Sequence, residues 1–358
     1  MSKPRVIAFY LPQFYPTPEN DEWWGKGFTE WTNVGKAKPL FKNHYQPRVP
    51  ADLGYYDLRV PEVREQQAQL ASEAGIEGFC YWHYWFSGRR LLDRVFDEVV
   101  KSGKPDFPFC LCWANHSWYK KTWTSEGKNI LLIEQLYPGE DDYIRHFNSL
   151  LPAFKDPRYM KVNGKLIFGV FAPLDLPHFQ SFKECWSKLA QKNGLEGFFF
   201  FAYNIEPAKN NSILQLGYNG VAIDYVKGKM IEASLLRRGF MRFQRQYLKI
   251  PQIRDYNTYV KIMKQDYQAC EGVYPVLVPN FDHSPRSGTA GIIMHNSTPE
   301  KWGTLCDTIF QETSVRQHDD NLIFVKAWNE WGEGNYLEPD FRFGRQYLDS
   351  IKTAIDKC

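Results

Sequence analysis

The sequence predicts a single (β/α)8 barrel, an α/β fold in which eight parallel strands close into a ring surrounded by helices. Three observations lead to this prediction. Eight short apolar runs recur along the 358 residues, amphipathic segments separate most of them, and each run is continuously apolar rather than alternating. Continuous apolarity is typical of parallel strands covered on both sides, and a strand–helix alternation predicts a parallel sheet. We therefore expect residues 1–358 to form one barrel domain with long loops.

The expected strands follow one another at regular intervals along the chain. They lie at residues 5–11, 76–85, 107–115, 165–171, 197–204, 220–226, 274–282 and 321–331. A ninth apolar run, NILLIEQL at 129–136, is expected to be an excursion after the third strand.

The segments between the strands carry helix start and stop signals. Three expected helices run into glycines, Gly75, Gly103 and Gly194, and further helices are expected at 255–272, 298–315 and 345–357. Glycine often ends a helix because it adopts the left-handed conformation at no steric cost. The helix at 298–315 should begin with Thr298 as its cap and Pro299 as its first residue.

The composition favours a carbohydrate ligand over a nucleic acid. Aromatic residues make up 16% of the chain, with 12 Trp, 21 Tyr and 26 Phe, and the net charge is only +3. Aromatic rings stack on the apolar C–H faces of sugars, whereas a charge this small gives no indication of a nucleic-acid partner. An aromatic-rich core is the alternative explanation.

Cysteine usage and the N-terminus indicate the compartment. The seven cysteines lie mostly within apolar segments, which favours reduced, buried thiols over a disulfide framework. Cys110 and Cys112 lack a second cysteine pair, so neither a metal site nor a cofactor is expected. The chain as given shows no signal-peptide pattern and no 18-residue apolar run, which predicts a cytoplasmic protein.

Polar and aromatic residues gather at the C-terminal ends of the expected strands, where barrel enzymes carry their chemistry. The loop at 19–48 is long, and long loops are usually functional, so we interpret it as one wall of a saccharide cleft. The alternative is a barrel cap with buried tryptophans. The predicted substrate-binding residues are Tyr10, Trp24, Trp31, His83, Trp113, Asn115, Tyr203, Asp282, Asn329 and Trp331.

The segment AWNEWGEGNYLEPD, residues 327–340, places Glu330 and Glu333 three residues apart among aromatic residues and glycines. Glycosidic bonds are generally cleaved by two carboxyl groups in different protonation states. With this spacing in a loop or first helical turn, both carboxylates can face one pocket, and we predict that they are catalytic. The alternative is that one of them caps a helix or pairs with an arginine such as Arg342 or Arg345.

WNEWGEG resembles the signature of glycoside hydrolase family 99 and its relatives, which include the WbsX-type proteins of bacterial polysaccharide loci. The segments YLPQFYP, WWGKGFTEWTNV, GFCYWHYWFSGRRLL, CLCWANHSW and PNFDHSPR are similar as well, and the resemblance covers residues 5–348. Asn115-His116 departs from the Asn-Glu that relatives often have. The resemblance implies a (β/α)8 barrel and endo-acting cleavage of α-mannosidic bonds with retention of configuration.

The resemblance also implies roles for the two glutamates. Glu330 matches the base that acts on the sugar's own 2-hydroxyl, which attacks the anomeric carbon and gives a 1,2-anhydro sugar. Glu333 matches the acid that protonates the departing oxygen and then deprotonates water. Because α-mannosides and α-rhamnosides carry a suitable 2-hydroxyl, the expected partner is an oligo- or polysaccharide of that type.

Two other classes of function remain open. The first is a glycosyltransferase in surface-polysaccharide assembly, although no glycine-rich phosphate loop follows the first strand, and EDD at 140–142 is better explained as favourable charge at a helix start. The segment 227–254 holds eight Lys/Arg and one Glu, so it could dock on an anionic membrane surface or grip an acidic polysaccharide. The second is a non-catalytic sugar-binding barrel.

Overall fold

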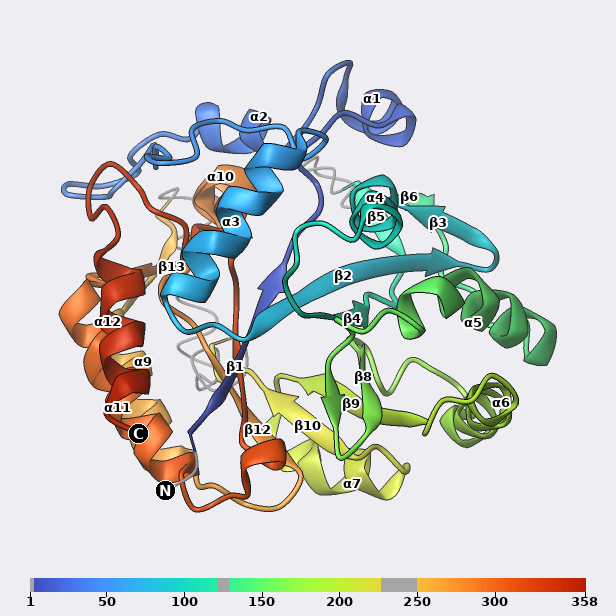
Figure 1. The fold of residues 1–358 in the computed structure, drawn as a ribbon. Helices are drawn as coiled ribbons and strands as arrows, with labels where there is room; N and C mark the ends of the chain where they lie inside the picture. Colours follow the sequence, from blue (N-terminus) through green and yellow to red (C-terminus); the bar gives the residue numbers. More distant parts are fainter. Residues whose placement is uncertain (1–2, 121–128, 227–249) are drawn as a thin grey trace.

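The computed structural model describes residues 3–120, 129–226 and 250–358, and it confirms the (β/α)8 barrel (Figure 1). Each of the eight predicted apolar runs contains one parallel strand. The strands are β1 (Arg5–Tyr10), β2 (Gly78–Phe86), β4 (Phe109–Trp113), β8 (Lys165–Val170), β9 (Phe198–Asn204), β10 (Gly220–Ile223), β12 (Val273–Leu277) and β14 (Leu322–Val325). They pair in chain order, and β1 pairs with both β2 and β14, which closes the ring.

The last two barrel strands are shorter than predicted. β12 ends at Leu277 and β14 at Val325, whereas the apolar runs continue to residues 282 and 331. Beyond β14 the chain leaves the barrel and forms a small antiparallel pair, β15 (Asn329–Glu330) with β16 (Asn335–Tyr336). The loops at this end of the barrel are buried and hold further apolar residues, such as Phe281 and Trp328, so the apolar runs extend beyond the strands.

Helices surround the barrel in the positions predicted by the amphipathic segments, except that α7 was not predicted. They are α3 (Pro61–Glu73), α4 (Arg94–Ser102), α5 (Glu140–Phe154), α6 (Phe179–Lys192), α7 (Asn210–Gln215), α9 (Tyr256–Asp266), α11 (Pro299–Thr313) and α12 (Gln346–Asp356). Gly103 and Gly194 have φ of 69° and 72°, as expected after a helix end. Thr298 caps α11, its hydroxyl accepting from the Lys301 amide at 3.4 Å.

Other elements sit on the loops. The long first loop contains α1 (Pro18–Trp24) and α2 (Glu30–Gly35), and α2 packs against α10 (Ser284–Ser287). The predicted excursion after the third barrel strand is the hairpin of β5 (Trp118–Lys120) and β6 (Ile130–Ile133). The short strands β3 (Arg89–Leu91) and β7 (Lys161–Val162) pair with β2 and β8.

One predicted helix is shorter than expected, and one predicted segment lies mostly outside the described residues. α9 ends at Asp266 instead of continuing to Gly272, because Tyr267 takes an extended backbone conformation. Most of the basic segment 227–254 lies outside the described residues, which resume at 250 with β11 (Gln252–Asp255) paired in parallel to β13 (Ile292–His295). The acidic EDD triplet does begin α5, as predicted.

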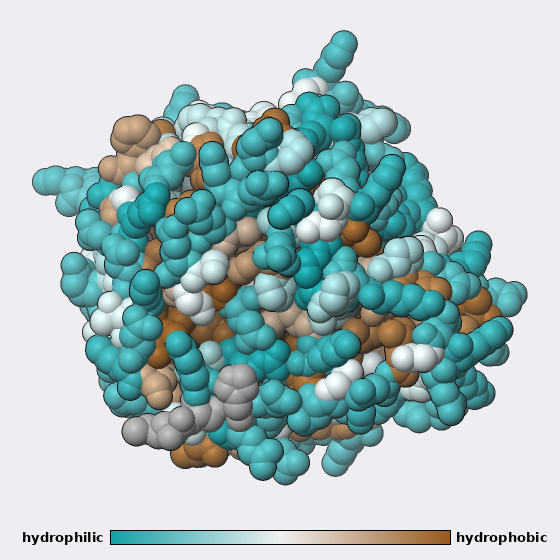
Figure 2. Space-filling model, in the orientation of Figure 1, coloured by the Kyte–Doolittle hydropathy of each residue, from teal (hydrophilic) through white to brown (hydrophobic). Residues whose placement is uncertain are grey.

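The surface and the cysteines are as the composition suggests. Figure 2 shows a face covered mostly by hydrophilic side chains, with hydrophobic residues visible between them. All seven cysteines are free and five of them are buried. Within the described part of the chain, no helix is long and apolar enough to cross a membrane, and no group of three His, Cys, Asp or Glu side chains is arranged to hold a metal ion.

Candidate active site

Glu330 and Glu333 lie together at the C-terminal end of the barrel, directly after β14. Glu330 belongs to β15 and Glu333 ends a short 3-10 helix, Trp331–Glu333. Lys326, the first residue after β14, contacts both carboxylates: its Nζ is 3.7 Å from Glu330 Oε2 and 3.3 Å from Glu333 Oε2. The two residues are 4% and 7% exposed. One buried ammonium therefore holds the two carboxylates side by side.

Glu330 is buried and has a second donor besides Lys326. The indole nitrogen of Trp82 donates to Glu330 Oε1 at 2.7 Å. Burial raises the pKa of Glu330, and the neighbouring Glu333 carboxylate adds to this, while Lys326 opposes it. A buried carboxyl that holds its proton at higher pH than usual is suited to proton transfer near neutral pH.

Glu333 has a different setting, because it lies against a second cation. Arg286, on α10, donates from Nη1 to Glu333 Oε1 at 2.6 Å and from Nη2 to Glu30 Oε2 at 2.9 Å. The predicted alternative of an arginine partner is therefore correct in kind but wrong in residue, since Arg345 pairs with Asp52. Arg286 is the side chain that fixes Glu333 beneath α2.

The two cations are firmly charged. Burial by itself lowers the pKa of Lys326, but the Glu330 and Glu333 carboxylates outweigh burial and raise it. Burial likewise opposes the charge of Arg286, and the carboxylates of Glu30 and Glu333 raise its pKa. The cluster is therefore an ion network of three acids and two bases, in which the loss of either base leaves a buried carboxylate without its cation.

Gly332 and Gly334 make room for this network rather than for a ligand directly. A Cβ on Gly332 would lie 1.9 Å from Glu30 Oε2, so only glycine lets the Glu30 carboxylate reach Arg286. A Cβ on Gly334, whose φ is +54°, would lie 2.8 Å from the Cβ of Asp282. The two glycines therefore make space for buried partners of the loop.

Aromatic side chains border the network on the barrel side. Trp82 stacks on Phe9 with centroids 4.6 Å apart, and its edge meets Phe171 and Tyr203. The Tyr203 hydroxyl donates to Asp224 in a short hydrogen bond. Of the residues predicted from strand ends, Tyr203 thus lies near the glutamates, close enough that both carboxylates help to raise its pKa after burial and Asp224.

Three of the residues predicted to contact the sugar face the surrounding helices in the structure. The Tyr10 hydroxyl donates to Gln67 on α3 at 2.7 Å. His83 Nε2 lies 2.8 Å from His146 Nε2 on α5, and Trp113 packs edge-on against the same histidine. Successive side chains of a strand point to opposite faces, so these residues lie on the outer face of the barrel while Trp82 lies on the inner face.

Four further predicted contacts hold loops together. Asn115 binds the Ala172 amide and carbonyl, and Asn329 binds both backbone groups of Leu11. These buried amides join neighbouring barrel units by replacing missing backbone hydrogen bonds. Trp31 and Trp331 pack on each other, and the Trp331 indole nitrogen donates to buried Glu338 at 2.6 Å.

The last two predicted contacts lie away from the glutamate pair. Asp282 turns to the far side of the loop, where His44 and Gln46 bind its carboxylate. Trp24 is 42% exposed at the end of α1, with Lys120 over its ring. Trp23 and Trp31 are only partly buried, so the alternative for the loop at 19–48, a cap with buried tryptophans, does not describe its tryptophans fully.

The sequence analysis missed four residues of the network: Trp82, Lys326, Arg286 and Glu30. Lys326 and Trp82 carried a usable signal, because a charged residue ends a fully apolar strand and an indole lies next to the chosen His83. Arg286 and Glu30 are 256 residues apart in the chain, and only the folded structure pairs them.

Comparison with known proteins decides the family. The family described as Glycosyltransferase WbsX matches residues 6–351. The chain belongs to the WbsX family. Two proteins named WxcX, from two strains of Xanthomonas campestris pv. campestris and described as uncharacterized, are each 35% identical to it over 360 residues. The match covers 99% of this chain but only 50% of each relative, so the chain spans about half the length of these WbsX-family relatives.

Solved structures show the same barrel. The family 99 endo-α-mannosidase from Bacteroides thetaiotaomicron aligns with a TM-score of 0.53 at 13% identity, covering 99% of this chain and 97% of that one. A glycoside hydrolase-like protein aligns with a TM-score of 0.56 at 12% identity, covering 99% and 94%. At such low identity the likeness establishes the fold of this WbsX-family protein, which is that of family 99 hydrolases.

Proposed function

We propose that this WbsX-family protein is a retaining, endo-acting glycoside hydrolase on an α-mannoside- or α-rhamnoside-type polysaccharide. The observation that supports the proposal is the pair of carboxylates that share Lys326 at the C-terminal end of the barrel. Barrel enzymes place their chemistry at this end, and glycosidases use two carboxyl groups there. A sugar-binding protein has no need of two buried acids beside one ammonium.

The proposed route uses the substrate's own 2-hydroxyl as the nucleophile. One glutamate removes the proton of this hydroxyl, whose oxygen bonds to the anomeric carbon while the bond to the departing oxygen breaks. The other glutamate protonates the departing oxygen, so the first product is a 1,2-anhydro sugar. Water then opens the anhydro ring with the proton transfers reversed, and two inversions at the anomeric carbon give retention.

The resemblance assigns the base role to Glu330 and the acid role to Glu333, and we retain this assignment as the hypothesis to test. The contacts of the two glutamates in the structure favour the opposite protonation. Arg286 and Lys326 favour the ionised form of Glu333, whereas burial raises the pKa of Glu330. For Glu333 to act as the acid, a bound sugar must weaken its contact with Arg286, whose side chain is 25% exposed.

Two variants and two substrates test both the function and the assignment. Glu330→Gln and Glu333→Gln should each lower kcat on a natural glycan by about 10²–10⁴-fold. An aryl glycoside with a good leaving group needs no acid, so it should restore turnover to the acid variant alone. Glu206→Gln, at the end of another barrel strand, is the matched control. Near-normal cleavage by either variant of the pair would refute the mechanism, as would efficient cleavage of a 2-deoxy substrate.

A transferase is the second candidate, because the WbsX family is described as a glycosyltransferase family. The same two carboxylates could activate an acceptor hydroxyl. Incubation with polysaccharide alone, and separately with nucleotide- or lipid-linked donors, distinguishes the two candidates. Release of reducing ends without any donor identifies the hydrolase, and product formation only with a donor identifies the transferase.

A further inference from the structure

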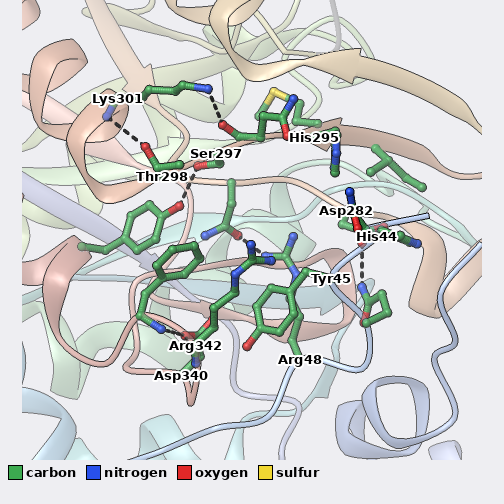
Figure 3. Close-up of a pocket in the computed structure, with 18 residues that line it drawn as sticks. His44, Tyr45, Arg48, Asp282, His295, Ser297, Thr298, Lys301, Asp340 and Arg342 are labelled. Carbon is green, nitrogen blue, oxygen red and sulfur yellow. Dashed lines mark hydrogen bonds and ion pairs between the residues drawn. The ribbon is translucent and has the colours of Figure 1, made fainter. Parts of the chain in front are cut away.

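A cavity of about 610 Å³ lies next to the loop that carries the two glutamates, and neither glutamate is among the residues that line it (Figure 3). Its walls come from the first loop at 43–48, from residues that follow β12, and from residues 340–343 that follow β14. Loops after the seventh and eighth strands are where barrels often bind phosphate groups. A volume of this size is suited to a small ligand.

The cavity and the glutamate loop share one wall. The backbone amide of Asp282 donates to the carbonyl of Glu333 at 2.6 Å, and Arg48 donates to the carbonyl of Gly334 at 2.9 Å. A ligand in the cavity would therefore lie directly behind the proposed catalytic residues. This shared wall places the cavity next to the proposed catalytic site, as expected of a subsite of the same enzyme.

The two carboxylates in the cavity are already satisfied by the protein. Asp282 Oδ2 lies 2.7 Å from both His44 Nε2 and Gln46 Nε2, and Oδ1 accepts from the Ser284 amide. Although burial opposes ionisation, His44 and Arg48 hold the pKa of Asp282 at about 2. Asp282 is therefore ionised and fully engaged, so it leaves no oxygen atom to bind a cationic ligand.

Asp340 is occupied in the same way. Its Oδ2 accepts from the Tyr336 hydroxyl at 2.7 Å, and its Oδ1 accepts from the backbone amides of Arg342 and Phe343 at 3.0 and 2.7 Å. These contacts shape the turn that carries Arg342. Asp340 binds the backbone amide of Arg342 and not its guanidinium, which lies over the rings of Tyr45 and Phe343.

Two cations of the cavity have no carboxylate partner among the described residues. The Arg342 guanidinium lies over the rings of Tyr45 and Phe343, 4.9 and 5.1 Å from their centroids. Lys301 Nζ donates to the backbone carbonyl of Asn296 at 2.8 Å. Figure 3 shows the two on different sides of the cavity, with Lys301 in the first turn of α11, where the helix dipole adds positive potential.

Buried polar atoms in the wall also lack partners. Among the described residues, nothing hydrogen-bonds to Arg48 Nε or to Gln46 Oε1, although both residues are more than nine-tenths buried. An unpaired buried donor or acceptor is costly unless a ligand or water satisfies it. The donors suit an oxyanion, and the amide oxygen suits a hydroxyl.

We propose that this cavity binds a saccharide that carries an oxyanion, either a phosphate or a carboxylate. The unpaired cations Arg342 and Lys301 would bind the anion, and Gln46 would accept from a sugar hydroxyl. The identity of the ligand as a saccharide rests on the proposed function, whereas its negative charge follows from the side chains alone. The proposed polysaccharide substrate would therefore contain an acidic sugar or a phosphate substituent.

Calorimetric titration of the whole protein tests the site without requiring turnover. The probes are glucose 1-phosphate, glucuronate, neutral glucose and inorganic phosphate. We expect one or both anionic sugars to bind more tightly than glucose and than phosphate alone, and the stronger of them identifies the oxyanion. Equal binding of glucose, equal binding of inorganic phosphate, or no binding of either anionic sugar would overturn the proposal.

Matched variants separate the cavity from general surface charge. Arg342→Gln and Lys301→Gln should each weaken binding of the anionic sugar by about tenfold, the usual loss for a hydrogen bond to a charged group. Arg345→Gln, three residues further on and paired outside the cavity with Asp52, should bind like wild type. An equal loss in all three variants would refute the site. Glu330→Gln should bind normally, so the site can be judged even if no hydrolysis is found.

Discussion

Lys326 Nζ lies 3.3 Å from a carboxylate oxygen of Glu333, with both side chains almost fully buried. The same ammonium also contacts Glu330. The apolar strand β14 is therefore followed by a buried cation, Lys326. Among the described residues, the carboxylates within 4 Å of its Nζ are those of the two proposed catalytic acids. The arrangement fixes the acids in space and sets how readily each holds a proton.

Lys326→Met should destabilise the fold by about 3–5 kcal/mol, because two buried carboxylates lose their shared cation. The pair should then share a proton, which moves the acidic limb of any pH–rate profile to higher pH. Urea unfolding and a pH–rate series measure the two effects.

A double variant and a control test this explanation. Adding Glu330→Gln to Lys326→Met removes one of the unpaired charges and should restore part of the stability. Lys352→Met on α12 serves as the exposed control. If the double variant is no more stable than the single one, the shared contact is unimportant.

Gly332→Ala should break the pairing of Glu30 with Arg286, since the added Cβ would lie 1.9 Å from the Glu30 carboxylate. Crowding of this kind costs about 1–3 kcal/mol and would also shift Arg286 away from Glu333. Thermal unfolding and the kinetic constants report the two consequences. Gly35→Ala, in a helix position with nothing within 4 Å, should be neutral or slightly stabilising. A similar response of both variants would show that the close packing is unimportant.

Trp82→Phe and His83→Phe compare the two faces of β2. The first variant removes the donor to Glu330, a loss of about 1.5–3 kcal/mol that should lower kcat by tenfold or more. The second removes a buried partner of His146 and should lower the melting temperature without changing KM. Kinetics and thermal unfolding of both variants measure this contrast. A kinetic defect confined to His83→Phe would mean that the inner face has been misassigned.

Glu338 should make stability depend on pH. Burial raises its pKa to about 7, against hydrogen bonds from Trp331, Gln67 and Tyr56 that favour the ionised form. The folded protein therefore binds this proton more tightly than the unfolded chain, whose glutamate titrates near its ordinary value of 4.5. Stability from this group is complete below that value and is lost as the pH rises towards 7.

Glu338→Gln should remove the loss of stability with rising pH. Its melting temperature should therefore change less than that of wild type between about pH 5 and 7, the range set by the raised pKa of about 7. Thermal unfolding across that range measures the difference. Glu62→Gln, exposed in the first turn of α3, should follow wild type. A wild-type slope in Glu338→Gln would assign the pH dependence to another group.

The sequence predicted the barrel because parallel strands are apolar throughout, but the same property hid the orientation of each side chain. Trp82 and His83 are neighbours in an unbroken apolar run, and nothing in the pattern says which one faces the barrel interior. Asn115 follows β4 as expected, and Asn329 lies in β15 rather than at the end of β14; both amides bind the backbone. Whether a strand-end amide meets a ligand or a loop depends on unpaired backbone groups nearby, which a sequence does not display.

The glutamate pair was predictable for a different reason. Its members are three residues apart, so local spacing alone brings them close, whereas the Glu30–Arg286 pair depends on a contact across 256 residues. The cavity next to the loop also depends on segments that are distant in the sequence. Arg48 and Arg342 line it together only because the first and last loops lie side by side in the fold.

The position of β14 between β1 and β12 has a consequence for biosynthesis. When the first 320 residues have left the ribosome, seven barrel strands are available. The ring is still open between β1 and β12, because β14 pairs with both. Lys326 and both acids emerge after that point, so the proposed catalytic groups leave the ribosome only together with the strand that closes the ring. Ring closure and assembly of the proposed site therefore depend on the same segment of the chain.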